Sequence, residues 1–261
     1  MELSKTCDAG VVHTLDPAYY TSDAIYQQEC AGLFMRAWQY AGHASQAPNP
    51  GDYFTFEIAG ERLFCVRNYD NVLLTFYNVC QHCAHELVKG QGHCDKTIVC
   101  PYHAWSYNLD GNLLRGPNTE VIPAQAKEGI CLTPVRTQEF CGFVFVNLDD
   151  NAEPMGVWFP EVETQLREFV PNIDALMPIE TISVSEKCNW KVSVENYSEC
   201  YHCRINHRTF ATGVIKPETY DIQPQGYCLR HTTECQNLDQ MSYPIDLGTN
   251  GHAGDYSSWF L

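Results

Sequence analysis

The sequence of 261 residues predicts an α+β fold, in which a small antiparallel β domain is followed by a mixture of helices and strands. Short β-rich runs separated by turn residues fill the chain from about Gln39 to Asp149, which is typical of an antiparallel β domain. Helical patterns lie before and after this block. The acidic stretch 149–154, which ends in Pro154, indicates the boundary between the two parts. The expected division is an N-terminal helical segment at 1–38, which packs with the last part, then the β domain at 39–149 and a helix-and-sheet part at 150–261.

Local patterns predict the individual elements. Ser22 is a suitable N-cap for a helix that runs to about Phe34. Alternating and β-branched runs predict strands, and the Asp110-Gly111 pair is typical of a hairpin turn. Strands are expected at 53–58, 63–66, 72–79, 105–109, 112–114, 141–148 and 182–187. Helices are expected at 161–169 and 189–200, and the last forty residues are expected to be rich in loops.

The composition excludes several classes of protein. With 44% hydrophobic and 12% aromatic residues, the chain can bury a core and is unlike a disordered chain. A net charge of −16 lacks the basic footprint of nucleic-acid binding, and the longest apolar run, 140–146, is far too short to cross a bilayer. We therefore expect no nucleic-acid and no membrane partner. Fourteen cysteines without a secretory pattern at the N-terminus favour a reducing compartment, and we expect the cytoplasm.

Two Cys-His pairs lie in the predicted β domain. Seventeen residues separate the first pair, Cys80 and His82, from the second pair, Cys100 and His103. Two thiolates and two imidazoles on two loops can hold a [2Fe–2S] cluster with thiolates on one iron and imidazoles on the other. Because Cys83 is also present, a structural zinc site made of Cys80, Cys83, Cys100 and His103 fits the spacing equally well. Spacing alone leaves both metals open.

A second group of candidate ligands lies near the end of the predicted helix 189–200. Two imidazoles and a carboxylate on one face of Fe(II) leave positions for dioxygen and substrate, and His202 and His207 are candidates for the imidazoles. Five residues correspond to about 140° on a helix, so the helix should end or distort between the two histidines. Glu199 lies three residues before His202 and is expected to share its helical face. Capping or packing histidines, or a zinc or redox site at Cys200-x-x-Cys203, remain alternatives.

The residues around the first group resemble a known family. The stretches Phe76–His82 and Cys100–Gly111 resemble the cluster-binding segments of the Rieske domain in Rieske-type non-haem iron oxygenases. This resemblance implies a Rieske antiparallel β-sandwich and a [2Fe–2S] cluster bound by Cys80, His82, Cys100 and His103. The sequence departs from the family at Cys83-Ala84, where Arg-Gly is common.

The stretch Asn189–His207 resembles the mononuclear-iron segment of the same oxygenases, with His202 and His207 as iron ligands and the third ligand expected beyond residue 261. Ring-hydroxylating members usually carry Asp where this chain has Glu199. The pattern Glu-Cys-Tyr-His-Cys is similar to members that oxidise quaternary ammonium compounds, such as the carnitine, choline, stachydrine and betaine monooxygenases. The presence of Ala104, where Gly is commoner, points to the same group.

The resemblance implies a terminal oxygenase component with a partial catalytic domain. In such systems NAD(P)H electrons pass through a separate flavin/iron–sulfur reductase to the cluster and then to a mononuclear Fe(II), where O2 oxidises a small substrate. The family forms homotrimers, and the acid at Glu199 links the centres of neighbouring subunits. The alternatives are an arene ring-hydroxylating dioxygenase alpha subunit, a truncated Rieske electron carrier without chemistry of its own, and a zinc-stabilised binding module.

Overall fold

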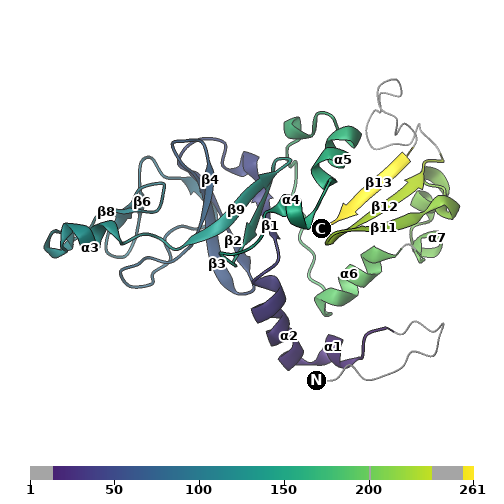
Figure 1. The fold of residues 1–261 in the computed structure, drawn as a ribbon, viewed down its shortest axis with the longest axis horizontal. Coiled ribbons are helices and arrows are strands. Elements are labelled where there is room, and N and C mark those ends of the chain that lie inside the picture. Colours follow the sequence, from purple (N-terminus) through teal and green to yellow (C-terminus); the bar gives the residue numbers. More distant parts are fainter. Residues whose placement is uncertain (1–13, 200, 237–254) are drawn as a thin grey trace.

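A computed structural model of the chain describes residues 14–199, 201–236 and 255–261. Figure 1 shows two bodies side by side, with strands β1–β10 in one and helices α6 and α7 with strands β11–β13 in the other. Across the described ranges, each helix is too short or too polar to cross a lipid bilayer.

The helical elements are short. They are α1 Ala18–Thr21, α2 Asp23–Glu29, the π-helical turn η1 Cys30–Phe34, η2 Ala44–Gln46, η3 Thr119–Val121, α3 Ala124–Glu128, α4 Met155–Trp158, α5 Val162–Phe169, η4 Ile173–Ala175, α6 Trp190–Ser198, α7 Cys203–Asn206, η5 Phe210–Val214 and η6 Pro217–Thr219.

The strands form three antiparallel sheets. They are β1 Gln39–His43, β2 Asp52–Ile58, β3 Glu61–Arg67, β4 Leu73–Tyr77, β5 Gln91–His93, β6 Ile98–Val99, β7 Ser106–Tyr107, β8 Leu113–Arg115, β9 Pro134–Phe140, β10 Phe143–Asn147, β11 Asp221–Gln225, β12 Cys228–Glu234 and β13 Asp255–Phe260. The order in the largest sheet is β1-β10-β9-β4-β3-β2-β5, and the two smaller sheets are β6-β7-β8 and β11-β12-β13.

The core of the β domain lies between its large and small sheets. Phe64 and Phe76 on the large sheet pack in one cluster with Ile98 and Tyr107 on the small sheet, and each is at most 3% exposed. Apolar side chains on alternate positions of both sheets therefore bury each other, which gives the predicted β-sandwich.

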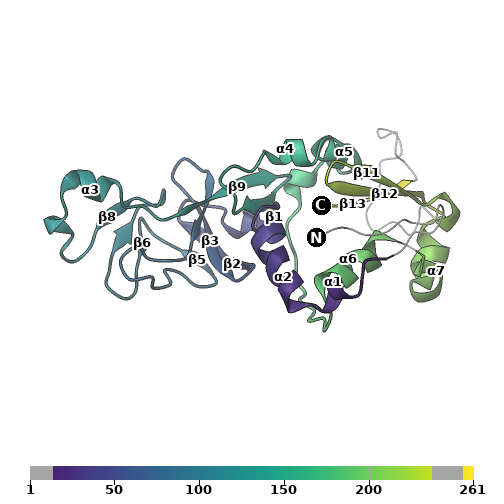
Figure 2. The ribbon, with the colours of Figure 1, turned by 60° about the horizontal axis from the view of Figure 1, so that its bottom comes forward.

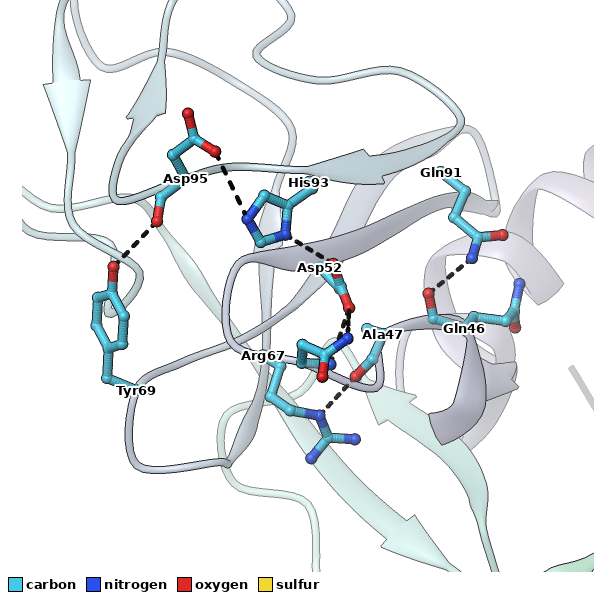
Figure 3. Close-up of polar contacts among 9 residues, drawn as sticks. Gln46, Ala47, Asp52, Arg67, Tyr69, Gln91, His93 and Asp95 are labelled. Atoms are coloured by element: carbon cyan, nitrogen blue, oxygen red, sulfur yellow. Dashed lines mark hydrogen bonds and ion pairs between the residues drawn. The ribbon is translucent and has the colours of Figure 1, made fainter.

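Polar contacts fix the edge of the large sheet where β2 pairs with β5 (Figure 3). The Asp52 carboxylate lies 2.7 Å from His93 Nδ1, and Arg67 donates from Nε to the carbonyl of Ala47. Burial acts to raise the pKa of Asp52, but hydrogen bonds from His93 and from Asn49 lower it overall. The contact between His93 and Asp52 holds β5 against β2, and the chain passes from β5 through β6 to Cys100.

Two predictions about secondary structure were wrong. Residues 182–187 form no strand, and Ile182 and Val184 are 78% and 77% exposed, because none of the strands in the described part of the chain pairs with this segment. The last forty residues are not mainly loops within the described part, since β11 and β12 pair from Asp221 with Thr232 to Gln225 with Cys228, and β13 extends the sheet. Residues 237–254 and Cys200 lie outside the described residues.

The N-terminal helix contacts helix α6 through a buried ion pair. Lys191 Nζ lies 2.6 Å from Glu29 Oε1, and the two side chains are 9% and 15% exposed. Trp190 Nε1 donates to the other Glu29 oxygen at 2.9 Å and its ring packs edge-on against Phe34. Burial acts to raise the pKa of Glu29, but these contacts with Lys191 and Trp190 lower it overall. The ion pair therefore fixes α6, the helix that leads into the second group of candidate ligands.

We expect Glu29→Gln to destabilise the chain by about 3 kcal/mol, because it leaves the buried Lys191 ammonium without a counter-charge. Urea unfolding followed by tryptophan fluorescence measures the change. The matched control is Glu163→Gln, whose partner Arg167 is exposed, and it should lower the free energy of unfolding much less. Equal effects of the two substitutions would show that the buried pair contributes no more than a surface pair.

Candidate functional site

Two loops of the β domain have the same hydrogen-bonded turn. The amide N–H of Ala84 donates to the Cys80 carbonyl at 2.9 Å, and that of Ala104 donates to the Cys100 carbonyl at 3.0 Å. The amide of each cysteine donates in turn to the carbonyl five residues further on, at 2.9 and 2.8 Å. Both alanines have φ of +57°, a left-handed conformation that glycine adopts most readily. The backbone itself thus presents the two Cys-His pairs in equivalent turns.

In both loops the cysteine sulfur is buried and the histidine ring is exposed. Cys80 and Cys100 are each 1% exposed and belong to the core between the sheets. His82 and His103 are exposed, and their ring centroids lie 4.7 Å apart. His82 also stacks on Trp105 at 4.8 Å with an interplanar angle of 11°, which fixes the ring. Two thiols inside and two imidazoles outside form the asymmetric donor set that a Rieske-type cluster needs.

Tyr107 supports the inner side of this site. Its hydroxyl lies 3.2 Å from Cys80 Sγ and accepts a hydrogen bond from the Gln81 amide at 3.1 Å. Burial raises the pKa of the Cys80 thiol and the neighbouring Cys100 raises it further, while the Tyr107 hydroxyl opposes the shift. Two buried thiols become thiolates only where a cation compensates their charge, so the chemistry of this donor set fits a bound iron–sulfur centre.

Cys83 lies with the imidazoles rather than with the buried thiols. It is exposed, and its Sγ is 3.5 Å from His103 Nδ1. The ligand atoms of His82, Cys83 and His103 all lie within 4.8 Å of one another. A zinc site built from Cys80, Cys83, Cys100 and His103 would have to combine two buried thiols with two exposed groups. The arrangement therefore favours the [2Fe–2S] alternative, in which Cys83 is not a ligand.

The second group of candidate residues flanks a single helical turn. Helix α6 ends at Ser198, and Glu199 is extended with φ −136° and ψ 143°. His202 and His207 stand at the two ends of α7, with ring centroids 5.1 Å apart. The predicted helix ends at Ser198, before both histidines, and the separate helical turn α7 lies between them. The expectation that Glu199 and His202 share a helical face was wrong, because the chain leaves the helix at Glu199, yet its carboxylate still comes within 4.0 Å of His202 Nδ1.

A cavity of about 170 Å³ lies against these two histidines. Aromatic side chains make up much of its wall, and they come from α6, from η5, from the residue before β11 and from β13: Tyr197, Phe210, Tyr220 and Tyr256. Sequence analysis did not identify these residues or Tyr107, because their roles depend on packing between elements that lie apart in the chain. The abundance of aromatic residues was the only indication in the sequence.

The two candidate sites lie far apart in the folded molecule. Strands β6 and β8, which belong to the small sheet beside the Cys-His loops, lie far from α6 and α7 in both ribbon views (Figure 1 and Figure 2). One chain therefore does not bring its own two sites together.

The chain matches two known family domains. Residues 37–126 match the Rieske [2Fe-2S] domain, and residues 173–250 match the catalytic domain of the ring hydroxylating alpha subunit. The chain belongs to the alpha subunits of Rieske-type non-haem iron oxygenases, and it carries the Rieske domain with part of the catalytic domain.

Individual relatives show which members of this family the chain resembles. The chain is 35% identical over 221 residues to the carnitine monooxygenase oxygenase subunit of Acinetobacter pittii, an alignment of 85% of this chain and 60% of the relative. It is 38% identical over 201 residues to the same subunit of Escherichia coli, which aligns 77% of this chain and 54% of the relative. A crystal structure of a quaternary ammonium Rieske monooxygenase bound to L-carnitine superposes with a TM-score of 0.76 at 34% identity, over 83% of this chain and 61% of that one. The chain thus spans a little over half the length of its relatives.

Proposed function

We propose that this chain is part of a terminal oxygenase that uses electrons from a reductase and O2 to oxidise a small quaternary ammonium compound. The observation that carries the proposal is the presence of both donor sets in one chain, one in the β domain and one beside an aromatic cavity. The resemblance to carnitine and glycine betaine monooxygenase oxygenase subunits supports the choice of substrate class.

We assign Cys80 and Cys100 to one iron of the cluster, and His82 and His103 to the other. His202 and His207 are assigned to the mononuclear iron, with a carboxylate from beyond residue 261 as the third ligand. When bound, the cluster supplies single electrons at a potential of about −150 to +300 mV, and the mononuclear iron activates O2. The chain's own contribution is to hold the imidazoles at the surface of the β domain and to shape the cavity.

The partners follow from the separation of the sites. Because the two sites of one chain lie at opposite ends, we propose that the cluster of one subunit serves the iron of a neighbour in a homotrimer. Inter-subunit electron transfer is described for a quaternary ammonium Rieske monooxygenase to which this chain is 30% identical with a TM-score of 0.81, over 93% of this chain and 64% of that one. A flavin/iron–sulfur reductase that uses NAD(P)H is the proposed electron donor. The frequent use of cysteine favours the cytoplasm.

Glu199 is proposed as the bridge between the two centres. Its carboxylate lies 4.0 Å from His202 Nδ1, and its side chain is 60% exposed. It can therefore accept a hydrogen bond from the ring of the iron ligand while facing a neighbouring subunit. Its exposure and its place outside the helix support a bridging role over a role as iron ligand.

The wall of the cavity suits a cationic substrate. The faces of Tyr197, Tyr220 and Tyr256 carry negative charge density that attracts a quaternary ammonium group. Oxidation of a carbon bonded to the quaternary nitrogen gives an α-hydroxylated product, which breaks at the C–N bond to release an amine and a carbonyl compound.

The first prediction for this assignment concerns Cys83→Ser. We expect the variant to keep a red-brown [2Fe–2S] cluster with unchanged iron and acid-labile sulfide, because Cys83 lies outside the buried thiol pair. Cys100→Ser is the comparison, and it should lose the cluster. Stoichiometric zinc in the parent chain, lost together with Cys83, would instead establish the zinc site.

The second prediction concerns Glu199→Gln in a form of the protein extended to the length of its relatives. Both metals should load and the reductase should still reduce the cluster, while substrate oxidation falls about 100-fold, because the bridging charge is gone. Glu218→Gln, also on an exposed acid, serves as the control. Turnover at the parental rate would show that electrons reach the iron by another path.

The third prediction concerns the substrate class. With reductase and NADH, the extended protein should consume O2 in the presence of L-carnitine, γ-butyrobetaine or glycine betaine and release an amine. Benzene and biphenyl serve as the competing substrates, since the chain also resembles the alpha subunits of benzene and biphenyl dioxygenases. Oxidation of the arenes without turnover of the amines would assign the chain to the ring-hydroxylating group.

A further inference from the structure

The hydroxyl group of a tyrosine in the cavity wall is hydrogen-bonded to a buried histidine. Tyr220 lies between η6 and β11, is half-buried, and lines the same cavity as His202 and His207. Its hydroxyl lies 2.6 Å from Nδ1 of His231, a residue on β12 that is 1% exposed. The pair joins the cavity to the interior of the β11-β12-β13 sheet.

Two aromatic rings pack against the side chain of His231. Its ring stacks on Tyr197 at 5.8 Å and meets the Tyr220 ring edge-on at 5.6 Å. Among the described residues, its Nε2 atom is buried and has no hydrogen-bond partner. Burial lowers the pKa of His231, so the ring is neutral and carries one N–H proton. Either Nδ1 or Nε2 holds that proton.

The two tautomers of His231 leave different groups on the ring without a hydrogen-bond partner. With the proton on Nε2, a buried N–H donor has no acceptor, and the Tyr220 hydroxyl donates its own proton to Nδ1. With the proton on Nδ1, His231 donates to the Tyr220 oxygen, and only an acceptor lone pair on Nε2 is left over. Buried N–H groups without a partner are rarer in proteins than unfilled acceptors, which favours the Nδ1–H form.

The Nδ1–H form leaves the Tyr220 hydroxyl proton free to point elsewhere. Among the described residues, His231 is the one hydrogen-bond partner of that hydroxyl. Burial raises the pKa of Tyr220 to about 12, so the group stays a neutral phenol and keeps its proton. With its oxygen engaged by His231, the proton is available to an acceptor inside the cavity.

We propose that Tyr220 is a substrate-binding hydrogen-bond donor and that His231 is a positioning residue, whose Nδ1–H directs the Tyr220 hydroxyl proton to an oxygen atom of the bound molecule. This inference rests on the proposed function, because the oxygen it selects is the carboxylate of a quaternary ammonium substrate. The aromatic faces then bind the cationic end, and Tyr220 distinguishes substrates that also carry an oxygen acceptor.

The first experiment measures the tautomer without any ligand. Two-bond 1H–15N correlation spectra of the labelled chain should show His231 as the Nδ1–H form, with the resonance assigned by its loss in His231→Gln. Tyr220→Phe removes the acceptor, so the ring should return to the Nε2–H form that free imidazoles prefer. An Nε2–H ring in the parent chain would overturn the inference.

The second experiment measures binding by calorimetry with two probes. γ-Butyrobetaine carries a carboxylate, and tetramethylammonium carries no oxygen. Tyr220→Phe should weaken γ-butyrobetaine about 10- to 100-fold, the range expected for a hydrogen bond to a charged group, and leave tetramethylammonium unchanged. Tyr227→Phe, at an exposed tyrosine outside the cavity wall, is the matched control and should change neither probe.

Equal binding of γ-butyrobetaine to the parent and to Tyr220→Phe would overturn the donor role. Failure of both probes to bind the parent chain would count against the proposed substrate class instead. In that case the tautomer of His231 alone supports or rejects the Tyr220–His231 arrangement. The proposed substrate class and the role of Tyr220 therefore fail in distinguishable ways.

Discussion

The burial of two thiols beneath two exposed imidazoles is the constraint on which the β domain depends. Cys80 and Cys100 belong to the core between the sheets, while His82 and His103 lie at its surface. The same hydrogen-bonded turn creates this difference in both loops. A bound centre is thus shielded on its sulfur side and accessible on its nitrogen side, which suits the proposed electron transfer to a neighbouring subunit.

The catalytic part is assembled differently, because its candidate residues come together from separate helices and strands. The buried pair of Lys191 and Glu29 fixes α6, and the chain then leaves the helix so that Glu199, His202 and His207 reach one cavity. The sheet behind the cavity supplies further aromatic residues. The site is therefore assembled by tertiary packing, whereas the Cys-His loops are assembled mainly by local turns.

That difference explains what could be predicted from the sequence. Local spacing identified the two Cys-His loops, the family resemblance selected Cys80, His82, Cys100 and His103 over a set with Cys83, and turn chemistry placed the hairpin at Asp110-Gly111. The sheet of β11, β12 and β13 was missed because Pro224 and the polar, exposed β11 lack the pattern of a buried strand. Residues 182–187 have that pattern but pair with no strand among the described residues, so alternation alone misled the prediction. Tyr220 and His231 could not be paired without knowing the strand register.

Pulsed EPR of the dithionite-reduced chain with 15N-labelled histidine tests the central claim most directly. If His82 and His103 bind one iron of a [2Fe–2S] cluster, the spectra will show a low average g value and two strongly coupled histidine nitrogens. A centre coupled to one histidine nitrogen or to none, or a protein that contains zinc and no acid-labile sulfide, would contradict the account.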